Sequence, residues 1–154
     1  MCVLCTNVAE SKEHLFFECF LSKEIIKFLL NSVEVQSKGF LFSEVTNLKN
    51  GVLAGASQCK VAGKAAINLA IYSIWKERNA RILRGEEKSI EAIKMEVDST
   101  LKMMLAKINT MELTHKNIQW AIAMGISPEF KRKESDATQT LATMQPIHSQ
   151  RRSA

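Results

Sequence analysis

Apolar residues through most of this chain recur at intervals of three and four positions, which is the spacing of one face of an α-helix. The clearest case runs from Ser89 to Ile108, where Ser89 stands at the N-cap position. Its apolar positions are Ile90, Ile93, Val97, Leu101, Met104, Leu105 and Ile108. We therefore predict an amphipathic helix here, with these side chains toward the core.

A second long helix is predicted over 60–85, with Gly85 as its C-terminal stop. The expected buried stripe consists of Val61, Ala65, Leu69, Tyr72 or Ile71, Trp75, Asn79 and Ile82. Because only a short segment separates this helix from the next one, the two should pack as an antiparallel hairpin. A short third helix is expected over 117–127, ended by Gly125 and Pro128.

Weaker signals flank this helical body. Residues 22–31 predict a short helix that begins at Ser22 as its N-cap. Its apolar positions are Ile25, Ile26, Leu29 and Leu30. Residues 32–56 have the character of a connector, and 128–154 are polar without a sustained apolar period. The last segment is therefore predicted to be a disordered tail.

The composition supports a helical fold and imposes no strong preference for a partner. Of the 154 residues, 46 % are hydrophobic and only 6 % aromatic, and there are six glycines and two prolines. So few turn-forming residues argue against an all-β fold. The net charge of +5 permits binding to nucleic acid without requiring it.

No apolar run reaches the roughly 18 residues needed to cross a bilayer, so no membrane association is expected. The first residues lack the basic and apolar regions of a secretory signal. We therefore expect an intracellular protein, nuclear or cytoplasmic and not secreted, whose cysteines are kept reduced. In such a compartment clustered cysteines bind metal more often than they form disulfides.

Three of the four cysteines and one histidine have the spacing Cys2-x2-Cys5-x8-His14-x4-Cys19. A two-residue gap lets one tight turn present both sulfurs to an ion, and the later pair completes a tetrahedron of ligands that zinc prefers. We predict a structural Zn²⁺ site, closed because the protein fills all four positions. On an uninterrupted helix His14 and Cys19 would lie about 140° apart, so a turn or helix break is expected between them.

Two alternatives remain open for these residues. Free cysteines behave as small hydrophobes, so Cys5 and Cys19 can simply be buried. Cys59 is a fourth thiol that can replace His14 as a ligand.

Together these features predict a mainly α protein, with a small N-terminal zinc knuckle, a helical hairpin or small helical bundle, and a disordered C-terminal tail. The expected parts are a zinc-knuckle-like segment with its following helix (1–31), a connector (32–56), a helical hairpin body (57–127) and the tail (128–154).

The opening stretch resembles the zinc-binding domain at the C-terminal end of reverse transcriptases from plant-type non-LTR (LINE-like) retrotransposons. That family has a Cys-x2-Cys pair, an acidic residue with Ser or Thr, His-Leu-Phe-Phe and a final Cys, followed later by Tyr-x-Ile-Trp-x-Glu-Arg-Asn-x-Arg. The matching residues of the first block are Cys2, Cys5, Glu10, Ser11, His14, Leu15, Phe16, Phe17 and Cys19. Those of the second block are Tyr72, Ile74, Trp75, Glu77, Arg78, Asn79 and Arg81.

The resemblance covers about Cys2 to Leu83 and implies that the Cys/His cluster binds zinc. The family domain normally carries a stretch before the first cysteine, whereas here only Met1 precedes it. We therefore expect the chain to correspond to an N-terminally truncated form of that domain.

No enzymatic activity is expected. Reverse transcriptases hold two catalytic metal ions with adjacent aspartates, whereas Asp98 and Asp136 are isolated in this sequence. The sequence also lacks a P-loop, a glycine-rich dinucleotide turn and the common hydrolase motifs. No small-molecule substrate is predicted.

The resulting hypothesis is a non-catalytic zinc-binding remnant of a retrotransposon reverse transcriptase that binds RNA or single-stranded DNA. An aromatic residue of a zinc knuckle can stack on an unpaired base while nearby cations contact phosphates. The candidate residues are Lys12, Phe16, Phe17, Lys23, Lys76, Arg78, Arg81 and Arg84.

Other interpretations of these residues stay open. Phe16 and Phe17 can pack beneath the zinc site, and Arg78 and Arg81 can contact Glu77 and the next helix. The chain would then be a structural or protein-interaction module, whose helical hairpin offers an apolar face to a protein partner. A relic without selected function is the third alternative.

Overall fold

A computed structural model of the chain describes residues 1–37, 39–55, 57–107, 111–112, 114–127 and 130–131. Its helical elements are the π-helix η1 (His14–Glu18) and the α-helices α1 (Phe20–Ser32), α2 (Phe42–Asn50), α3 (Gln58–Arg84), α4 (Ile90–Ala106) and α5 (His115–Ala123). Two-residue strands β1 (Met111–Glu112) and β2 (Phe130–Lys131) pair in parallel.

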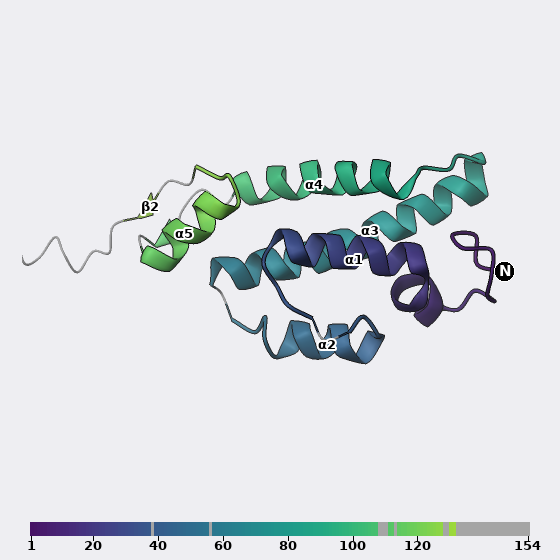
Figure 1. The fold of residues 1–154 in the computed structure, drawn as a ribbon, viewed down its shortest axis with the longest axis horizontal. Helices are drawn as coiled ribbons and strands as arrows, with labels where there is room; N and C mark the ends of the chain where they lie inside the picture. Colours follow the sequence, from purple (N-terminus) through teal and green to yellow (C-terminus); the bar gives the residue numbers. More distant parts are fainter. Residues whose placement is uncertain (38, 56, 108–110, 113, 128–129, 132–154) are drawn as a thin grey trace, which may run out of the picture.

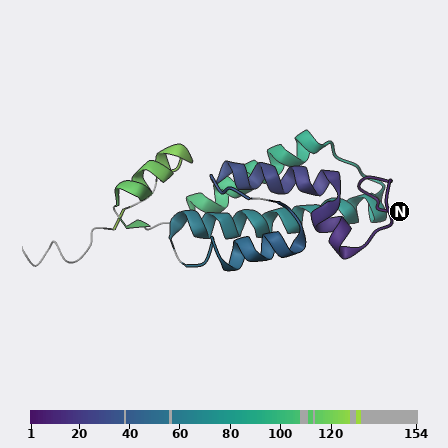
Figure 2. The same ribbon diagram turned by 60° about the horizontal axis from the view of Figure 1, so that its bottom comes forward.

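Helices α1, α3 and α4 form the centre of the molecule. Helix α1 packs against both α3 and α4, which also pack against each other (Figure 1). Helix α2 lies on the side of this bundle away from α4, while α5 and the N-terminus lie at opposite ends (Figure 2). The prediction of a mainly α fold is confirmed, and α1 shares a core with the hairpin.

Helix α1 follows its predicted pattern but begins earlier. Its four expected apolar side chains are all 0–1 % exposed: Ile25, Ile26, Leu29 and Leu30. The predicted cap at Ser22 is wrong, because the extended backbone of Cys19 starts the helix at Phe20. Ser22 is instead buried, and its hydroxyl donates a hydrogen bond to the carbonyl of Leu15.

Helix α4 is also close to its prediction. The Ser89 hydroxyl accepts a hydrogen bond of 3.1 Å from the amide of Ala92, as expected for an N-cap. Gly85 ends α3 in the left-handed region with φ 63°. The buried side chains of α4 are Ile93, Val97, Leu101 and Leu105. Met104 is 41 % exposed, contrary to prediction, and Ile108 lies outside the described residues.

The predicted buried stripe of α3 is confirmed at Leu69 but wrong at three other bulky positions. Tyr72, Trp75 and Ile82 are each at least half exposed. The buried face consists of Ala62, Gly63, Ala66, Ile67, Leu69, Ala70, Ile74, Glu77 and Ala80. Most of these residues are small, which lets the neighbouring helices approach α3 closely. A Cβ atom at Gly63 would lie 2.7 Å from the Leu53 side chain, so this glycine permits that contact.

The expected connector contains the unpredicted helix α2. Its core contacts come from only two buried residues, Val45 and Leu48, which is too few for a periodic pattern. The carboxylate of Glu44 accepts a hydrogen bond of 2.8 Å from the amide of Leu41 and so stabilises the start of the helix.

Helix α5 begins two residues before its predicted start and ends at Ala123. Two residues later, Gly125 takes a left-handed φ of 62°. Thr114 caps it by accepting a hydrogen bond of 3.2 Å from the amide of Asn117. Pro128 and the predicted tail lie outside the described residues, apart from the two residues of β2. Within the described parts of the chain, none of the helices has the length and apolarity needed to cross a membrane.

The neighbours Ile74 and Trp75 test which face of α3 is buried. Ile74 is fully buried and Trp75 is 50 % exposed, so Ile74→Ala should lower the free energy of unfolding by about 3 kcal/mol. Trp75→Ala should lower it by no more than about 1 kcal/mol, although it removes more atoms. Urea unfolding followed by circular dichroism measures both, and a larger loss for Trp75→Ala would contradict this packing.

Candidate metal centre

The first two cysteines are held together by a tight turn at the N-terminus. The amide of Cys2 donates to the carbonyl of Val8 over 2.7 Å, and the amide of Thr6 donates to the carbonyl of Cys2 over 2.8 Å. Thr6 takes a left-handed φ of 58°, which reverses the chain directly after Cys5. The two thiols of the Cys-x2-Cys pair therefore face the same region.

The other two ligand candidates lie at the ends of a π-helical turn. The amide of Cys19 donates to the carbonyl of His14 over 2.7 Å, a bond between residues five apart. In this turn the donor atoms of His14 and Cys19 lie close together, whereas on a regular α-helix residues five apart would point in different directions. At Cys19 the backbone becomes extended (φ −60°, ψ 137°) before α1 begins, so the predicted interruption is confirmed.

The donor atoms of Cys2, Cys5, His14 and Cys19 all lie within 4.8 Å of one another. Cys5 Sγ and His14 Nε2 are 3.3 Å apart. In a tetrahedral zinc site with bonds of about 2.3 Å, two sulfurs are about 3.8 Å apart, so only small shifts are needed to reach that geometry. The chain therefore brings together three thiols and one imidazole in a group that fits a metal ion. Cys59 lies elsewhere, at the start of α3.

Burial distinguishes the four residues. Cys2 and Cys19 are completely buried, His14 is 7 % exposed, and Cys5 is partly exposed at the rim. A group enclosed in this way excludes water from most of its surface, which strengthens interactions between an ion and its ligands.

The thiols of Cys5 and Cys19 differ in pKa. Backbone amide donation from Asn7, helped by His14, lowers the pKa of the Cys5 thiol to about 6. Burial raises the pKa of the Cys19 thiol to about 11, although the amides of Leu21 and Ser22 at the start of α1 oppose this effect. Cys5 therefore offers a thiolate at neutral pH, whereas Cys19 must lose a proton before it can bind a metal.

Two arginines of α3 attach the N-terminal segment to the helical bundle. The guanidinium of Arg78 donates through Nε and Nη2 to one carboxylate oxygen of Glu10, over 2.9 and 2.6 Å. The guanidinium of Arg81 donates to the carbonyls of Val3 and Leu4, each over 3.3 Å. These contacts fix the Cys-x2-Cys turn against the C-terminal half of α3.

Glu77 extends this network to the beginning of α4. Its side chain is 4 % exposed and accepts a hydrogen bond of 2.9 Å from Arg81 Nε. The same carboxylate oxygen accepts from the amide of Lys88, also over 2.9 Å. Arg81 further contacts the Glu87 carboxylate at 3.0 Å. A Glu-x3-Arg spacing on a helix signals such a pair, but its burial has no signature in the sequence.

The proposed nucleic-acid residues do not form one continuous basic face. Besides the two arginines already described, Lys76 pairs with Glu96 at 2.6 Å and Arg84 pairs with Glu86 at 2.8 Å. Lys12 and Lys23 are exposed. Their binding to nucleic acid stays a prediction.

The two aromatic candidates differ from each other. Phe17 is 9 % exposed, and its ring packs edge-to-face on Phe42 with centroids 5.4 Å apart. Phe16 is only partly buried and therefore retains an accessible surface. Of the two rings, that of Phe16 is therefore the more accessible to a nucleic-acid base.

Comparisons of the chain with protein-family models, with curated proteins and with solved structures find no match.

The Glu10–Arg78 pair should contribute a pH-dependent part of the stability. The Arg78 guanidinium lowers the pKa of the Glu10 carboxyl, so the charged form favours the folded state. This contribution is complete above the unfolded pKa of about 4.5 and is lost as the pH falls through the lower folded value. Glu10→Gln should therefore cost about 1 kcal/mol at pH 7, and the difference should disappear in acid.

Urea denaturation of four proteins at several pH values isolates the pair: the parent, Glu10→Gln, Arg78→Gln and the double variant. On the Arg78→Gln background, Glu10→Gln should have almost no further effect. An undiminished cost on that background, or one independent of pH, would contradict the assigned interaction.

Proposed function

We propose that this chain is a non-catalytic zinc-binding module in which the metal fixes the N-terminal segment to the end of a helical bundle. The observation that carries this proposal is the convergence of the donor atoms of Cys2, Cys5, His14 and Cys19 within 4.8 Å. Three thiolates and one imidazole are ligands that zinc prefers, and a four-ligand site leaves no open position for a reactive water. The function is therefore structural.

The small size of the N-terminal segment supports a stabilising role for the ion. Residues 1–11 contain no helix or strand, and the turn is held by a few backbone hydrogen bonds. A segment of this kind buries little apolar surface by itself, so metal binding would supply much of its folding free energy.

We further propose kinship with the zinc-binding domain of LINE-like reverse transcriptases. The two sequence blocks that carry the resemblance are in contact here. Glu10 of the first block pairs with Arg78 of the second, and Arg81 of the second block holds the carbonyls of Val3 and Leu4. A common structural role for the two blocks explains why they occur together in one sequence.

Metal analysis of the purified protein tests the site. The parent should contain about one zinc ion per chain, and Cys5→Ser and His14→Ala should each remove most of it. Cys59→Ser is the matched control and should retain the metal, because Cys59 lies outside the cluster. Chelation should also lower the melting temperature of the parent. A parent protein without metal, or loss of metal in Cys59→Ser, would contradict the proposal.

A second candidate function, binding of single-stranded nucleic acid, is favoured by an exposed aromatic pair. Tyr72 and Trp75 are 56 % and 50 % exposed, and their ring centroids are 6.1 Å apart. Trp75 also lines a surface hollow together with Lys12 and Phe16. Aromatic rings beside a cation are the usual means of holding unpaired bases without sequence preference.

Fluorescence anisotropy with a labelled oligouridylate tests this second function. Binding should weaken as salt rises, and Trp75→Ala or Lys12→Glu should each reduce affinity by about tenfold. Phe20→Ala is the control, since Phe20 is also exposed, at 66 %, but lies outside this hollow. Charge reversal of Arg78 or Arg81 is unsuitable, because both hold the N-terminal segment in place. Absence of salt-dependent binding by the parent would refute the second function.

A further inference from the structure

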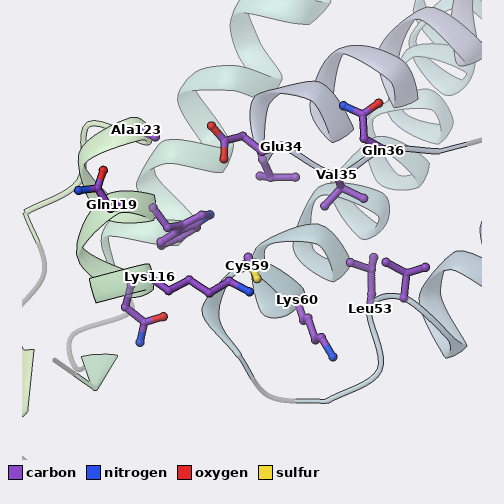
Figure 3. Close-up of a pocket in the computed structure, with 13 residues that line it drawn as sticks. Glu34, Val35, Gln36, Leu53, Cys59, Lys60, Lys116, Gln119 and Ala123 are labelled. Carbon is purple, nitrogen blue, oxygen red and sulfur yellow. The ribbon is translucent and has the colours of Figure 1, made fainter. Parts of the chain in front are cut away.

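A pocket of about 640 Å³ lies at the end of the bundle that carries α5. Its walls come from four segments: the segment directly after α1, the turn after α2, the start of α3 and one side of α5 (Figure 3). The N-terminal metal centre is at the opposite end of the bundle (Figure 1). The volume is within the range of pockets that bind small molecules, about 300–1,000 Å³.

The inner wall of the pocket is apolar. Val33, Val35 and Leu53 line it and are each less than 9 % exposed. Trp120 of α5 forms another part of the lining. This surface is suited to a hydrocarbon group, because removal of such a group from water is favourable in proportion to its buried area.

The indole of Trp120 supplies the first polar feature. The residue is 7 % exposed, and its Nε1 atom is buried without a hydrogen-bond partner among the described residues. Buried donors in folded proteins nearly always have an acceptor, because an unsatisfied donor is costly. A bound molecule with an oxygen acceptor would satisfy this N–H group.

The second polar feature is an excess of positive charge. Lys60 and Lys116 line the pocket, against the single carboxylate of Glu34. Lys60 donates one hydrogen bond of 2.7 Å to the carbonyl of Ala54. The Lys116 side chain extends from α5 toward Cys59 at the start of α3 (Figure 3). The lining therefore favours an anion over a neutral ligand.

The two polar features lie on the same face of α5. Lys116 and Trp120 are four residues apart, which places their side chains one turn from each other on one side of a helix. Ala123 continues that face and lines the pocket with a small side chain. A carboxylate bound against this face would lie beside both the ammonium of Lys116 and the indole of Trp120.

We propose that this pocket binds an amphipathic monocarboxylate, with its hydrocarbon chain against Val33, Val35 and Leu53 and its carboxylate toward Trp120 and Lys116. The apolar wall suits the hydrocarbon chain. The indole N–H, which has no partner among the described residues, and the two lysines suit the carboxylate. A neutral molecule of the same length would fill the apolar wall but would leave the ammonium groups without a counter-ion.

Decanoate and decanol are matched probes, because they share a hydrocarbon chain and differ in the charge of the head group. The variant Trp75→Phe leaves Trp120 as the single tryptophan of the full chain. The fluorescence of Trp120 in this variant should change as decanoate is added and should reach a plateau below the critical micelle concentration. The dissociation constant of decanoate should be at least about tenfold lower than that of decanol.

Three variants locate the binding site by calorimetry. Lys116→Gln should weaken decanoate binding by about tenfold and change decanol binding little, whereas Trp120→Phe, which removes the N–H donor, should weaken the binding of both probes. Ala123→Phe fills the pocket without removing a core side chain and should abolish binding of both probes. Lys27→Gln is the control for loss of one positive charge, since Lys27 is exposed on α1 and does not line the pocket.

The proposal is overturned if decanoate does not saturate the fluorescence change, or if both probes bind equally well. It is also overturned if Ala123→Phe still binds decanoate, because the site would then be elsewhere. Circular dichroism of each variant confirms that loss of binding is not loss of the fold. All of these outcomes are independent of whether the N-terminal cluster binds zinc.

Discussion

The buried ion pair between Glu77 and Arg81 connects three segments of this protein at one end of the bundle. Burial of two charges is costly, and it is tolerated only where further hydrogen bonds satisfy both groups. Here Arg81 also reaches the carbonyls of Val3 and Leu4, and Glu77 also accepts from the amide of Lys88. The pair therefore fixes the N-terminal turn, the end of α3 and the approach to α4 in one arrangement. The Cys/His cluster depends on that arrangement, because Cys2 and Cys5 belong to the turn that Arg81 holds.

Ion pairing changes what the net charge indicates about the surface of this protein. A value of +5 suggests a basic surface, yet several arginines and lysines are already paired with carboxylates of neighbouring segments. Lys94 and Glu24 make a comparable link of 2.9 Å between α4 and α1. These paired cations are accordingly less available to a partner's phosphates than unpaired ones would be. The lysines that line the α5 pocket are a local exception, because Glu34 is the one carboxylate among its lining residues.

Sequence reasoning succeeded where the signal was local. The periodic apolar positions of α1 and α4 identified their buried faces, and ligand type with spacing identified the four residues that converge near the N-terminus. It failed for α3, because side-chain size was taken to indicate burial, whereas close helix packing selects small residues such as Ala66 and Ala70. Helix α2 was missed because it has only two buried side chains. The α5 pocket was beyond prediction, since four separate segments form it and its main polar signal is the Trp120 N–H, which has no partner among the described residues.

Helix α3 runs without interruption from Gln58 to Arg84, and it contributes Cys59 to the pocket at one end and Arg81 to the N-terminal turn at the other. These two residues are separated by about 33 Å along the axis at about 1.5 Å per residue. Insertion or deletion of a single residue between them would rotate one end against the other by about 100°. The number of residues in this helix between Cys59 and Arg81 is therefore constrained. Evolutionary change in it should proceed by substitution, and length variation should be confined to the loops that flank it.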